Sequence, residues 1–102
     1  MAWLRHKFNA KRTVTDRIKF SSRKESQFYE NLKIRKAGGE ILFFLRQVPF
    51  HLSGGVRYVV DFVAFTADGS VHFYDVKGMK TAMYVMKKKM VEAEYPIEIE
   101  EV

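Results

Sequence analysis

The sequence predicts a single α/β domain with the element order helix, three strands, helix, strand. Two observations predict this order. Apolar residues recur at helical spacing at about 23–36 and 81–94, and runs rich in Val, Phe, Tyr and Ile lie between and after these stretches. The length of 102 residues fits one domain with a modest core and leaves no room for a second.

The first helix is expected from about Arg23 to Lys36. Ser22 stands at the N-cap position and Glu25 follows three residues later, the spacing of a capping box. Gly38-Gly39 is expected to end the helix. Four residues share one helix face because they recur at i, i+3, i+4 and i+7, namely Glu25, Phe28, Tyr29 and Leu32.

A strand is expected over Glu40–Gln47, stopped or bent near Pro49, and Ser53–Gly55 is expected to form a loop. Two further apolar runs predict a pair of strands, one containing Tyr58–Asp61 and one containing Phe73–Asp75 and ending in Asp-Val-Lys77. The segment between them, Thr66-Ala-Asp-Gly-Ser70, has the composition of a turn.

The length of this turn decides which side chains meet. Gly69 suits the left-handed residue of a three-residue hairpin loop, which would pair Thr66 with Ser70. Counting back along both strands then places Asp61 opposite Asp75, with Cβ atoms roughly 4.5–5.5 Å apart on one face. A two-residue loop would instead turn the two carboxylates to opposite faces.

Carboxylates at that distance repel each other and shift their pKa values unless a positive charge lies between them. A divalent metal is the usual solution, and hard oxygen ligands suit Mg²⁺, which uses one or two protein carboxylates and keeps several waters. Lys77 is expected on the same face as Asp75 because side chains alternate along a strand. Two acids, a lysine and a metal are suited to phosphodiester hydrolysis.

The second helix is expected from about Thr81 to Glu94, ended by Tyr95-Pro96, and Ile97–Glu100 alternates like a short last strand. The apolar side of this helix is expected to pack in the core. That side is formed by Met83, Met86, Met90 and Ala93.

Positive charge is concentrated at the N-terminus. The net charge is +6, and residues 1–24 contain eight Lys or Arg and one acid. We therefore expect a basic arm over residues 1–20 and a domain over residues 21–102, with the arm contacting a nucleic-acid backbone; the alternative is a solvated tail. The bases of the arm expected to contact DNA are Arg5, Lys7, Lys11, Arg12, Arg17 and Lys19.

Composition excludes other classes of site and protein. The absence of cysteine rules out disulfides and thiolate metal sites. No apolar run reaches the length of a bilayer crossing, and the N-terminus lacks the apolar core of a secretion signal. We expect a soluble cytoplasmic protein that has no membrane partner and no small-molecule cofactor.

Ordered motifs connect these elements to a known family. The element order, together with a helix acid, Asp61 and Asp75-Val-Lys77, resembles the PD-(D/E)XK nuclease superfamily. Within it the chain looks like small phage-encoded endodeoxyribonucleases, and it is similar to Holliday-junction resolvases and to the end-cleaving nuclease of Tn7-like transposons. The superfamily's proline is replaced by Val60. The motifs that carry the resemblance are Ser22–Glu25, Gly39–Ile41, Gln47–Phe50, Tyr58–Phe62, Asp75–Gly78 and Tyr84–Lys87.

The resemblance implies a restriction-endonuclease-like αβββαβ core, with a central mixed sheet flanked by helices. It also implies a Mg²⁺- or Mn²⁺-dependent endodeoxyribonuclease. Asp61 would be the shared metal ligand, Asp75 the second, with the carbonyl of Val76 as a third, and Glu25 would reach the metal from its helix directly or through water. Lys77 would position or deprotonate the attacking water, or neutralise charge on the phosphate.

The resemblance extends to DNA contacts and to context. Gln47 would line the cleft and Lys87 would project toward phosphate, although a Lys87–Lys89 run is also typical of a solvated helix face. A phage-encoded enzyme would act in the host cytoplasm, as a homodimer if it cuts both strands. Branched DNA is a candidate substrate by analogy with the resolvases.

Each site residue also has a structural interpretation. Asp61 would be an edge-strand acid in solvent, Asp75 a salt-bridge partner of Lys77 or Arg57, and Glu25 a capping residue only. Lys77 would be an exposed lysine at a strand end. At the level of the whole chain, two alternatives remain: a non-catalytic DNA-binding module that keeps the nuclease fold, and a nuclease subunit activated by a partner.

Overall fold

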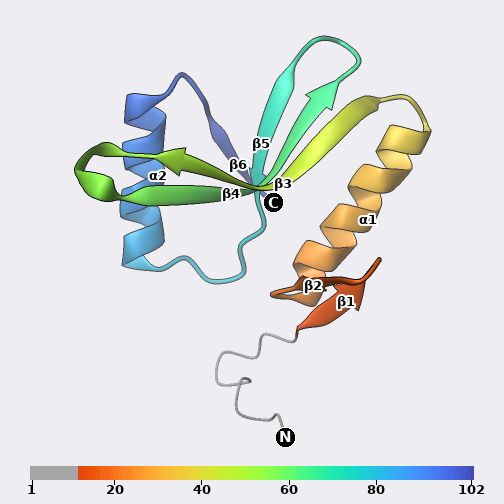
Figure 1. Cartoon of the computed structure of the whole chain (residues 1–102), viewed down its shortest axis with the longest axis horizontal. Coiled ribbons are helices and arrows are strands. Elements are labelled where there is room, and N and C mark those ends of the chain that lie inside the picture. The colour runs from red at the N-terminus through yellow and green to blue at the C-terminus, as the bar shows by residue number, and fades with distance from the viewer. Residues whose placement is uncertain (1–11) are drawn as a thin grey trace, which may run out of the picture.

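The computed structural model describes residues 12–102, and Figure 1 shows the arrangement of its elements. The elements are β1 (Thr13–Thr15), β2 (Ile18–Phe20), α1 (Arg23–Ala37), β3 (Ile41–His51), a 3₁₀ turn (Ser53–Gly55), β4 (Arg57–Thr66), β5 (Val71–Asp75), α2 (Ala82–Glu94) and β6 (Ile99–Glu101). The predicted order of helix, three strands, helix and strand is confirmed from α1 onward, and a short hairpin precedes it.

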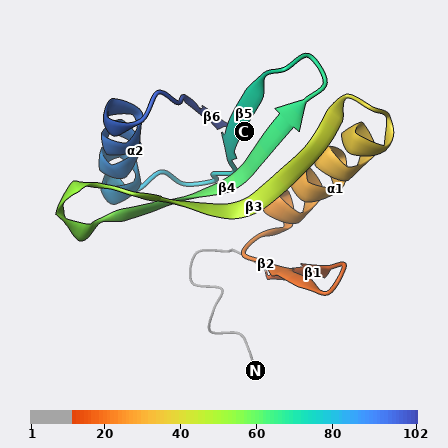
Figure 2. The same cartoon turned by 45° about the horizontal axis from the view of Figure 1, so that its top comes forward.

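The central sheet is mixed. Its strand order is β3-β4-β5-β6, in which β3, β4 and β5 pair antiparallel and β6 pairs parallel to β5. The two helices lie on either side of this sheet, and the small β1–β2 sheet lies beside α1 (Figure 2). The chain is therefore a mixed α/β fold, as predicted.

Each helix covers its own core cluster. The two clusters are separated by the sheet because successive strand residues point to opposite faces: Phe62 packs on the α1 side and its neighbour Val63 on the α2 side. The α1 cluster contains Phe20, Leu32, Ile41, Phe62, Ala64 and Tyr74, and the α2 cluster contains Leu52, Tyr58, Val60, Val63, Val91 and Ile99.

Helix α1 begins and ends as predicted. The hydroxyl of Ser22 accepts a hydrogen bond from the backbone N–H of Glu25 at 3.1 Å, and Gly38 is the C-cap. The predicted inward face is confirmed, since Leu32 is fully buried and Glu25 is only 5% exposed. A carboxylate on a buried helix face needs partners, and these lie in the site described below.

The turn between β4 and β5 has the predicted three-residue loop. The Thr66 N–H donates to the Ser70 carbonyl at 3.0 Å, the Gly69 N–H donates to the Thr66 carbonyl at 3.0 Å, and Gly69 has φ +90°. The strand register, in which Phe62 opposes Tyr74, is the register that places Asp61 opposite Asp75.

Gly69→Ala is expected to lower the free energy of unfolding by about 1 kcal/mol, because a Cβ is disfavoured at positive φ. No atom lies within 4 Å of the added Cβ, so the loss comes from the backbone alone. Gly78→Ala is the matched control, because its Cβ also meets open space but its φ is not positive. Urea denaturation of both variants measures the difference; equal losses would contradict the left-handed turn.

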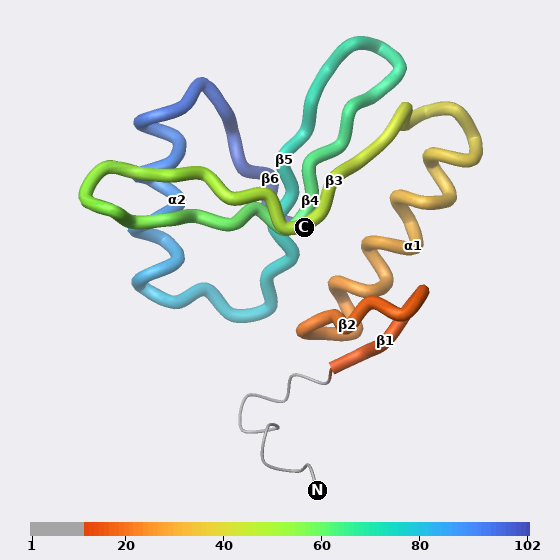
Figure 3. The backbone as a smooth tube through the Cα atoms, viewed as in Figure 1, coloured from red at the N-terminus to blue at the C-terminus, as the bar shows by residue number. Residues whose placement is uncertain are grey.

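The β3–β4 hairpin starts beside α1 and continues to α2, and Figure 3 follows the two strands side by side along this path. The first strand does not stop near Pro49, since β3 continues through it to His51, but its backbone is irregular at Gln47, two residues earlier, where φ is +52°. Pro49 opposes Val59 in the ladder. A proline is tolerated there because β3 is the edge strand of the sheet, where a missing N–H breaks no second ladder.

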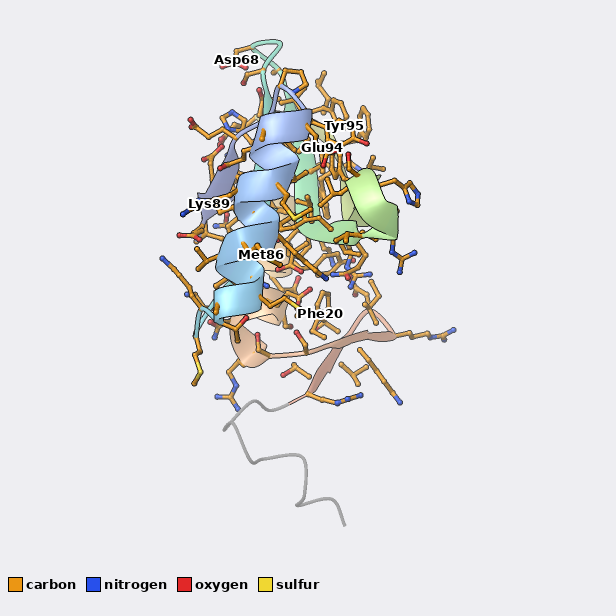
Figure 4. The ribbon with its side chains drawn as sticks, turned by 90° about the vertical axis from the view of Figure 1, so that its left-hand side faces the viewer. Phe20, Asp68, Met86, Lys89, Glu94 and Tyr95 are labelled. Carbon is orange, nitrogen blue, oxygen red and sulfur yellow. The ribbon has the colours of Figure 1, made fainter. Side chains whose placement is uncertain are left out.

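The predicted core face of α2 is also wrong. Met83 and Met86 are 60% and 53% exposed, whereas Val91 is fully buried and Met90 packs partly in the core. The helix turns its other side inward because Tyr84 packs there in the α2 cluster. Figure 4 views α2 from outside, with Met86 on the helix in front of the sheet.

The N-terminal segment joins the fold earlier than predicted. β1 and β2 form a tight hairpin in which Asp16 and Arg17 both have positive φ, the conformation of a two-residue turn that matches strand twist. Phe20 is 1% exposed and belongs to the α1 cluster. A domain boundary after residue 20 would separate this hairpin from its core. Of the basic residues predicted to contact DNA, Arg5, Lys7 and Lys11 lie outside the described residues.

Candidate active site

The candidate site lies at the point in the β3–β4 hairpin where the even-numbered residues switch between the α1 side and the α2 side of the sheet. On β3, Phe44 packs on the α1 side but Val48 packs on the α2 side, although both are even-numbered. On β4, Val60 packs on the α2 side and Phe62 on the α1 side. The change coincides with Gln47, whose φ of +52° is uncommon for a residue with a side chain. Such strained positions are typical of functional sites.

Asp61 and Asp75 meet across β4 and β5. The Oδ1 of Asp75 accepts a hydrogen bond from the Asp61 N–H at 3.0 Å, and the Oδ2 of Asp61 accepts from the Val76 N–H at 2.9 Å. The second oxygen of Asp75 accepts from the Tyr58 hydroxyl. We refer to Asp61 and Asp75 as the aspartate pair.

These contacts differ from the structural interpretations of the two acids. Asp61 lies on an inner strand and is only partly exposed, so it is not an edge acid in solvent. Asp75 is 1% exposed, and none of the salt bridges within residues 12–102 includes it. The backbone hydrogen bonds also give the aspartate pair a structural role, because they continue the contact between β4 and β5 where the strands separate.

Glu25 reaches the same place from α1 through a glutamine bridge. The side-chain amide of Gln47 donates to Glu25 Oε2 at 3.2 Å and to Asp61 Oδ1 at 3.3 Å. The other oxygen of Glu25 accepts from the Ser21 hydroxyl at 2.7 Å. The side chain of Glu25 thus faces the site, and only the Ser22 half of the capping box is present.

Burial and neighbouring acids disfavour the charged form of Asp61. Burial, together with the charges of Glu25 and Asp75, raises the pKa of this carboxyl to about 6, although the Val76 N–H and Lys77 lower it. A carboxylate held in this way is a group that a divalent cation would stabilise, because the cation favours its deprotonated form.

The raised pKa of Asp61 predicts a pH dependence of stability. The folded pKa of about 6 lies above the ordinary value of 3.8, so the folded state binds the proton more tightly than the unfolded state. Without divalent ions, the free energy of unfolding should therefore fall as pH rises from about 4 to 7, by up to about 3 kcal/mol for this group. Urea denaturation in EDTA across this range, with Asp61→Asn as reference, isolates the effect; parallel curves would contradict it.

Lys77 lies on the α2 side of the aspartate pair. Its Nζ is 4.6 Å from the centre of the Tyr84 ring, a cation–π contact, and its carbonyl accepts from Lys24 Nζ at 3.1 Å. Lys77 is half-buried rather than an exposed lysine at a strand end. It lines a hollow that we call the Lys77 hollow, together with Arg57, Tyr58, Val59, Asp75, Thr81, Met83, Tyr84 and Lys87.

A second hollow opens on the other member of the aspartate pair. We call it the Arg46 hollow, and its lining residues are Lys19, Ser21, Glu25, Arg46, Gln47 and Asp61. Lys19 and Gln47, both predicted as DNA contacts, lie here, whereas Lys87 lies in the Lys77 hollow. Arg12 and Arg17 are exposed and line neither.

Sequence reasoning missed Tyr58 and Arg46. Tyr58 is 4% exposed, and burial followed by the hydrogen bond to Asp75 raises the pKa of its hydroxyl well above the usual range. The spacing from Tyr58 to Asp61 does not reveal this contact, because it depends on the change of face in β4. Arg46 had a usable signal, since it is a base inside an apolar strand directly before Gln47.

The oxygen donors of the site fit a magnesium-type ion in part. Within residues 12–102 no group of three or more His, Asp or Glu side chains is arranged to hold a metal. The aspartate pair still supplies two hard carboxylates on neighbouring strands, and Mg²⁺ commonly uses one or two together with water. The Gln47 amide links Glu25 to Asp61, and a water or an ion that took the place of this amide would contact both carboxylates.

A second polar cluster lies away from this site, near the tip of the β4–β5 turn. Ser70 Oγ is 3.0 Å from His72 Nε2, and His72 Nδ1 is 2.7 Å from Glu100 Oε2. The order of these contacts is that of a hydrolytic triad, but Ser70 Oγ also donates to Asp68 at 2.6 Å and none of these residues lines either hollow. We assign the cluster to bracing of the turn, whose residue Asp68 is labelled in Figure 4.

Comparison with known proteins places the chain in a family. A family model described as "Protein of unknown function (DUF1064)" matches residues 5–100. The chain belongs to this family. No curated protein and no solved structure matches it. The DUF1064 match spans the whole candidate site, from Lys19 to Lys87. Neither helix of residues 12–102 has the length and apolar character that a bilayer crossing requires.

Proposed function

We propose that this DUF1064 protein is a Mg²⁺- or Mn²⁺-dependent endodeoxyribonuclease with a PD-(D/E)XK-type core. The observation that carries the proposal is the meeting of Asp61 and Asp75 across two strands, with Glu25 joined to Asp61 by the Gln47 amide. The supporting pattern is the element order αβββαβ with its helix acid, strand acid and Asp-Val-Lys motif. The phage origin and the likeness to resolvases remain expectations from the resemblance.

In this role the aspartate pair and the Val76 carbonyl would hold the ion, with Glu25 reaching it directly or through water. A bound Mg²⁺ or Mn²⁺ supplies Lewis acidity and a water of lowered pKa. Lys77, next to Asp75 in the Lys77 hollow, would orient the attacking water or neutralise charge that develops on the phosphate. The product would carry a 5′-phosphate, as the resemblance implies.

Positive residues on both sides of the aspartate pair support DNA as the partner. Lys87 and Arg57 line the Lys77 hollow, while Lys19 and Arg46 line the Arg46 hollow. Lysine and arginine beside a candidate metal site would contact phosphates on each side of the cut, which positions a duplex without reading its sequence. Cleavage of both strands would then require two copies, and we propose a two-fold homodimer that sedimentation of the purified chain tests.

A second candidate function is a nuclease subunit that a partner protein activates. The hydrogen bond from Tyr58 to Asp75 favours it, because one carboxylate of the aspartate pair is engaged by a buried hydroxyl. Activation would then require Tyr58 to release Asp75. A non-catalytic DNA-binding module is less well supported, since Glu25, Asp61, Asp75 and Lys77 are all present.

The experiment is cleavage of labelled four-way junction, flap and linear duplex by the purified chain. Each substrate is incubated with Mg²⁺, Mn²⁺ or EDTA, beside an Asp75→Ala/Lys77→Ala variant. Metal-dependent cutting that disappears in the variant supports the enzyme, and the preferred substrate identifies its DNA structure. Binding without cutting under every metal would rule out a stand-alone nuclease and favour the partner-activated subunit or the binding module.

A further inference from the structure

Arg46 is held in an unusual environment beside the candidate site. It lies on β3, and its guanidinium carbon is 4.7 Å from the centre of the Phe20 ring. Phe20 is 1% exposed and belongs to the α1 core, so the guanidinium rests on a fixed surface. The ring contact restricts where the arginine can point and leaves the edge of its planar group as the remaining donor surface.

One hydrogen-bond donor of Arg46 is not satisfied by the chain. Its Nε is buried without a hydrogen-bond partner, the one such buried side-chain atom among residues 12–102. None of the salt bridges within those residues includes Arg46, although Glu25 and Asp61 line the same hollow. A buried donor without a partner destabilises the folded state, and a ligand that draws the guanidinium toward an acceptor would remove that penalty.

The surroundings of Arg46 favour an anionic ligand. Lys19 comes to the hollow from β2, because the β1–β2 hairpin packs against α1. Ser21 lies directly before the N-terminal turn of α1, where the unpaired N–H groups of a helix favour negative charge. Two cations, Lys19 and Arg46, thus line this hollow, while the N-terminal turn of α1 already carries Glu25, which accepts from the Ser21 hydroxyl.

We propose that Arg46 and Lys19 bind the DNA phosphodiester that adjoins the cleaved one on the same strand. The inference rests on the proposed nuclease function, because it uses Asp61 to place the cleaved phosphate. Asp61 lines the Arg46 hollow and its partner Asp75 lines the Lys77 hollow, so a strand passing over the aspartate pair enters both. The planar guanidinium donates two parallel hydrogen bonds to two oxygens of one phosphate. A lysine ammonium contacts the same phosphate as a point charge.

The first test measures DNA binding in EDTA, by fluorescence anisotropy of a labelled duplex over a series of salt concentrations. Arg46→Met is expected to raise Kd about tenfold and to reduce the slope of log Kd against log salt by about 0.9, the value for one phosphate contact. Lys19→Met should reduce the slope similarly. Lys36→Met removes the same charge from the exposed last turn of α1 and should leave the slope unchanged.

The second test locates the contact on the DNA, with single neutral methylphosphonates placed on either side of the cleavage position. Neutralising the adjoining phosphate should weaken binding by wild-type protein about as much as Arg46→Met does. The same change should have no further effect on Arg46→Met. Equal losses in both proteins, or a variant slope equal to that of wild type, would overturn the proposal. The salt series requires no cleavage, so it tests the phosphate contact even if the cutting assay shows that the nuclease proposal has failed.

Discussion

Asp61→Asn is expected to reduce DNA cleavage by about 10³-fold or more while the chain remains folded. The variant loses the carboxylate that we assign to the metal, and with it the charge stabilisation that such a ligand supplies. The amide oxygen still accepts the Val76 N–H that Asp61 Oδ2 accepts in the wild type. The measurement is the single-turnover cleavage rate in Mn²⁺, with the same variant followed by urea denaturation.

The two readouts of Asp61→Asn should move in opposite directions. Burial and the neighbouring acids raise the pKa of Asp61 to about 6, so its negative charge destabilises the folded state at neutral pH without metal. Removal of that charge should raise the free energy of unfolding in EDTA while activity is lost. Glu30→Gln, at an exposed position of α1, is the control and should leave both unchanged. A variant that cuts DNA within tenfold of wild type would contradict the assignment of Asp61.

Phe62→Ala is expected to lower the free energy of unfolding by about 3–5 kcal/mol. Phe62 is fully buried in the α1 cluster, where its ring centre lies 5.5 Å from that of Phe28 and 6.3 Å from that of Phe44. Truncation leaves a cavity between helix and sheet that the surrounding aromatic rings cannot close. The loss is read from urea denaturation monitored by circular dichroism.

Phe43→Ala is the comparison within the same hairpin. Phe43 is 44% exposed and stacks on Phe65 at 4.4 Å, so its removal loses surface contact but leaves no cavity. We expect a loss of about 1 kcal/mol or less. If both variants lost the same stability, the placement of Phe62 in the α1 core and of Phe43 at the surface would be contradicted.

Local signals in the sequence were sufficient for the order of the elements from α1 onward and for the register of the aspartate pair. Gly69 follows Asp68 at a position of positive φ, which glycine adopts readily. The three-residue loop that it permits sets which strand residues oppose each other. The cap at Ser22 and the stop at Gly38 likewise depend on neighbours in sequence. Features of this kind are readable because the turn and the cap chemistry act over a few residues.

The features that were missed depend on contacts between distant segments. Tyr58 meets Asp75 because β4 changes face beside Gln47, and Arg46 meets Phe20 because the β1–β2 hairpin packs against α1. A regular alternation along both strands would have kept the even-numbered residues on one side, and nothing in the apolar pattern marks the change.

Helix α2 shows a further limit of the sequence pattern. The Met83–Met86–Met90 spacing satisfies a helical repeat, but Tyr84 and Val91 on another side of the helix contact the sheet. Periodicity predicts that a helix is amphipathic and cannot by itself select between two apolar sides.

The most direct test of the metal-dependent nuclease is cleavage of supercoiled plasmid by the purified chain at low salt, compared in Mn²⁺ and in EDTA. We predict nicked and linear products in Mn²⁺, none in EDTA, and none from Asp61→Asn in either condition. Products that persist in EDTA, or that Asp61→Asn forms as fast as wild type, would contradict the claim that the aspartate pair is the catalytic metal site.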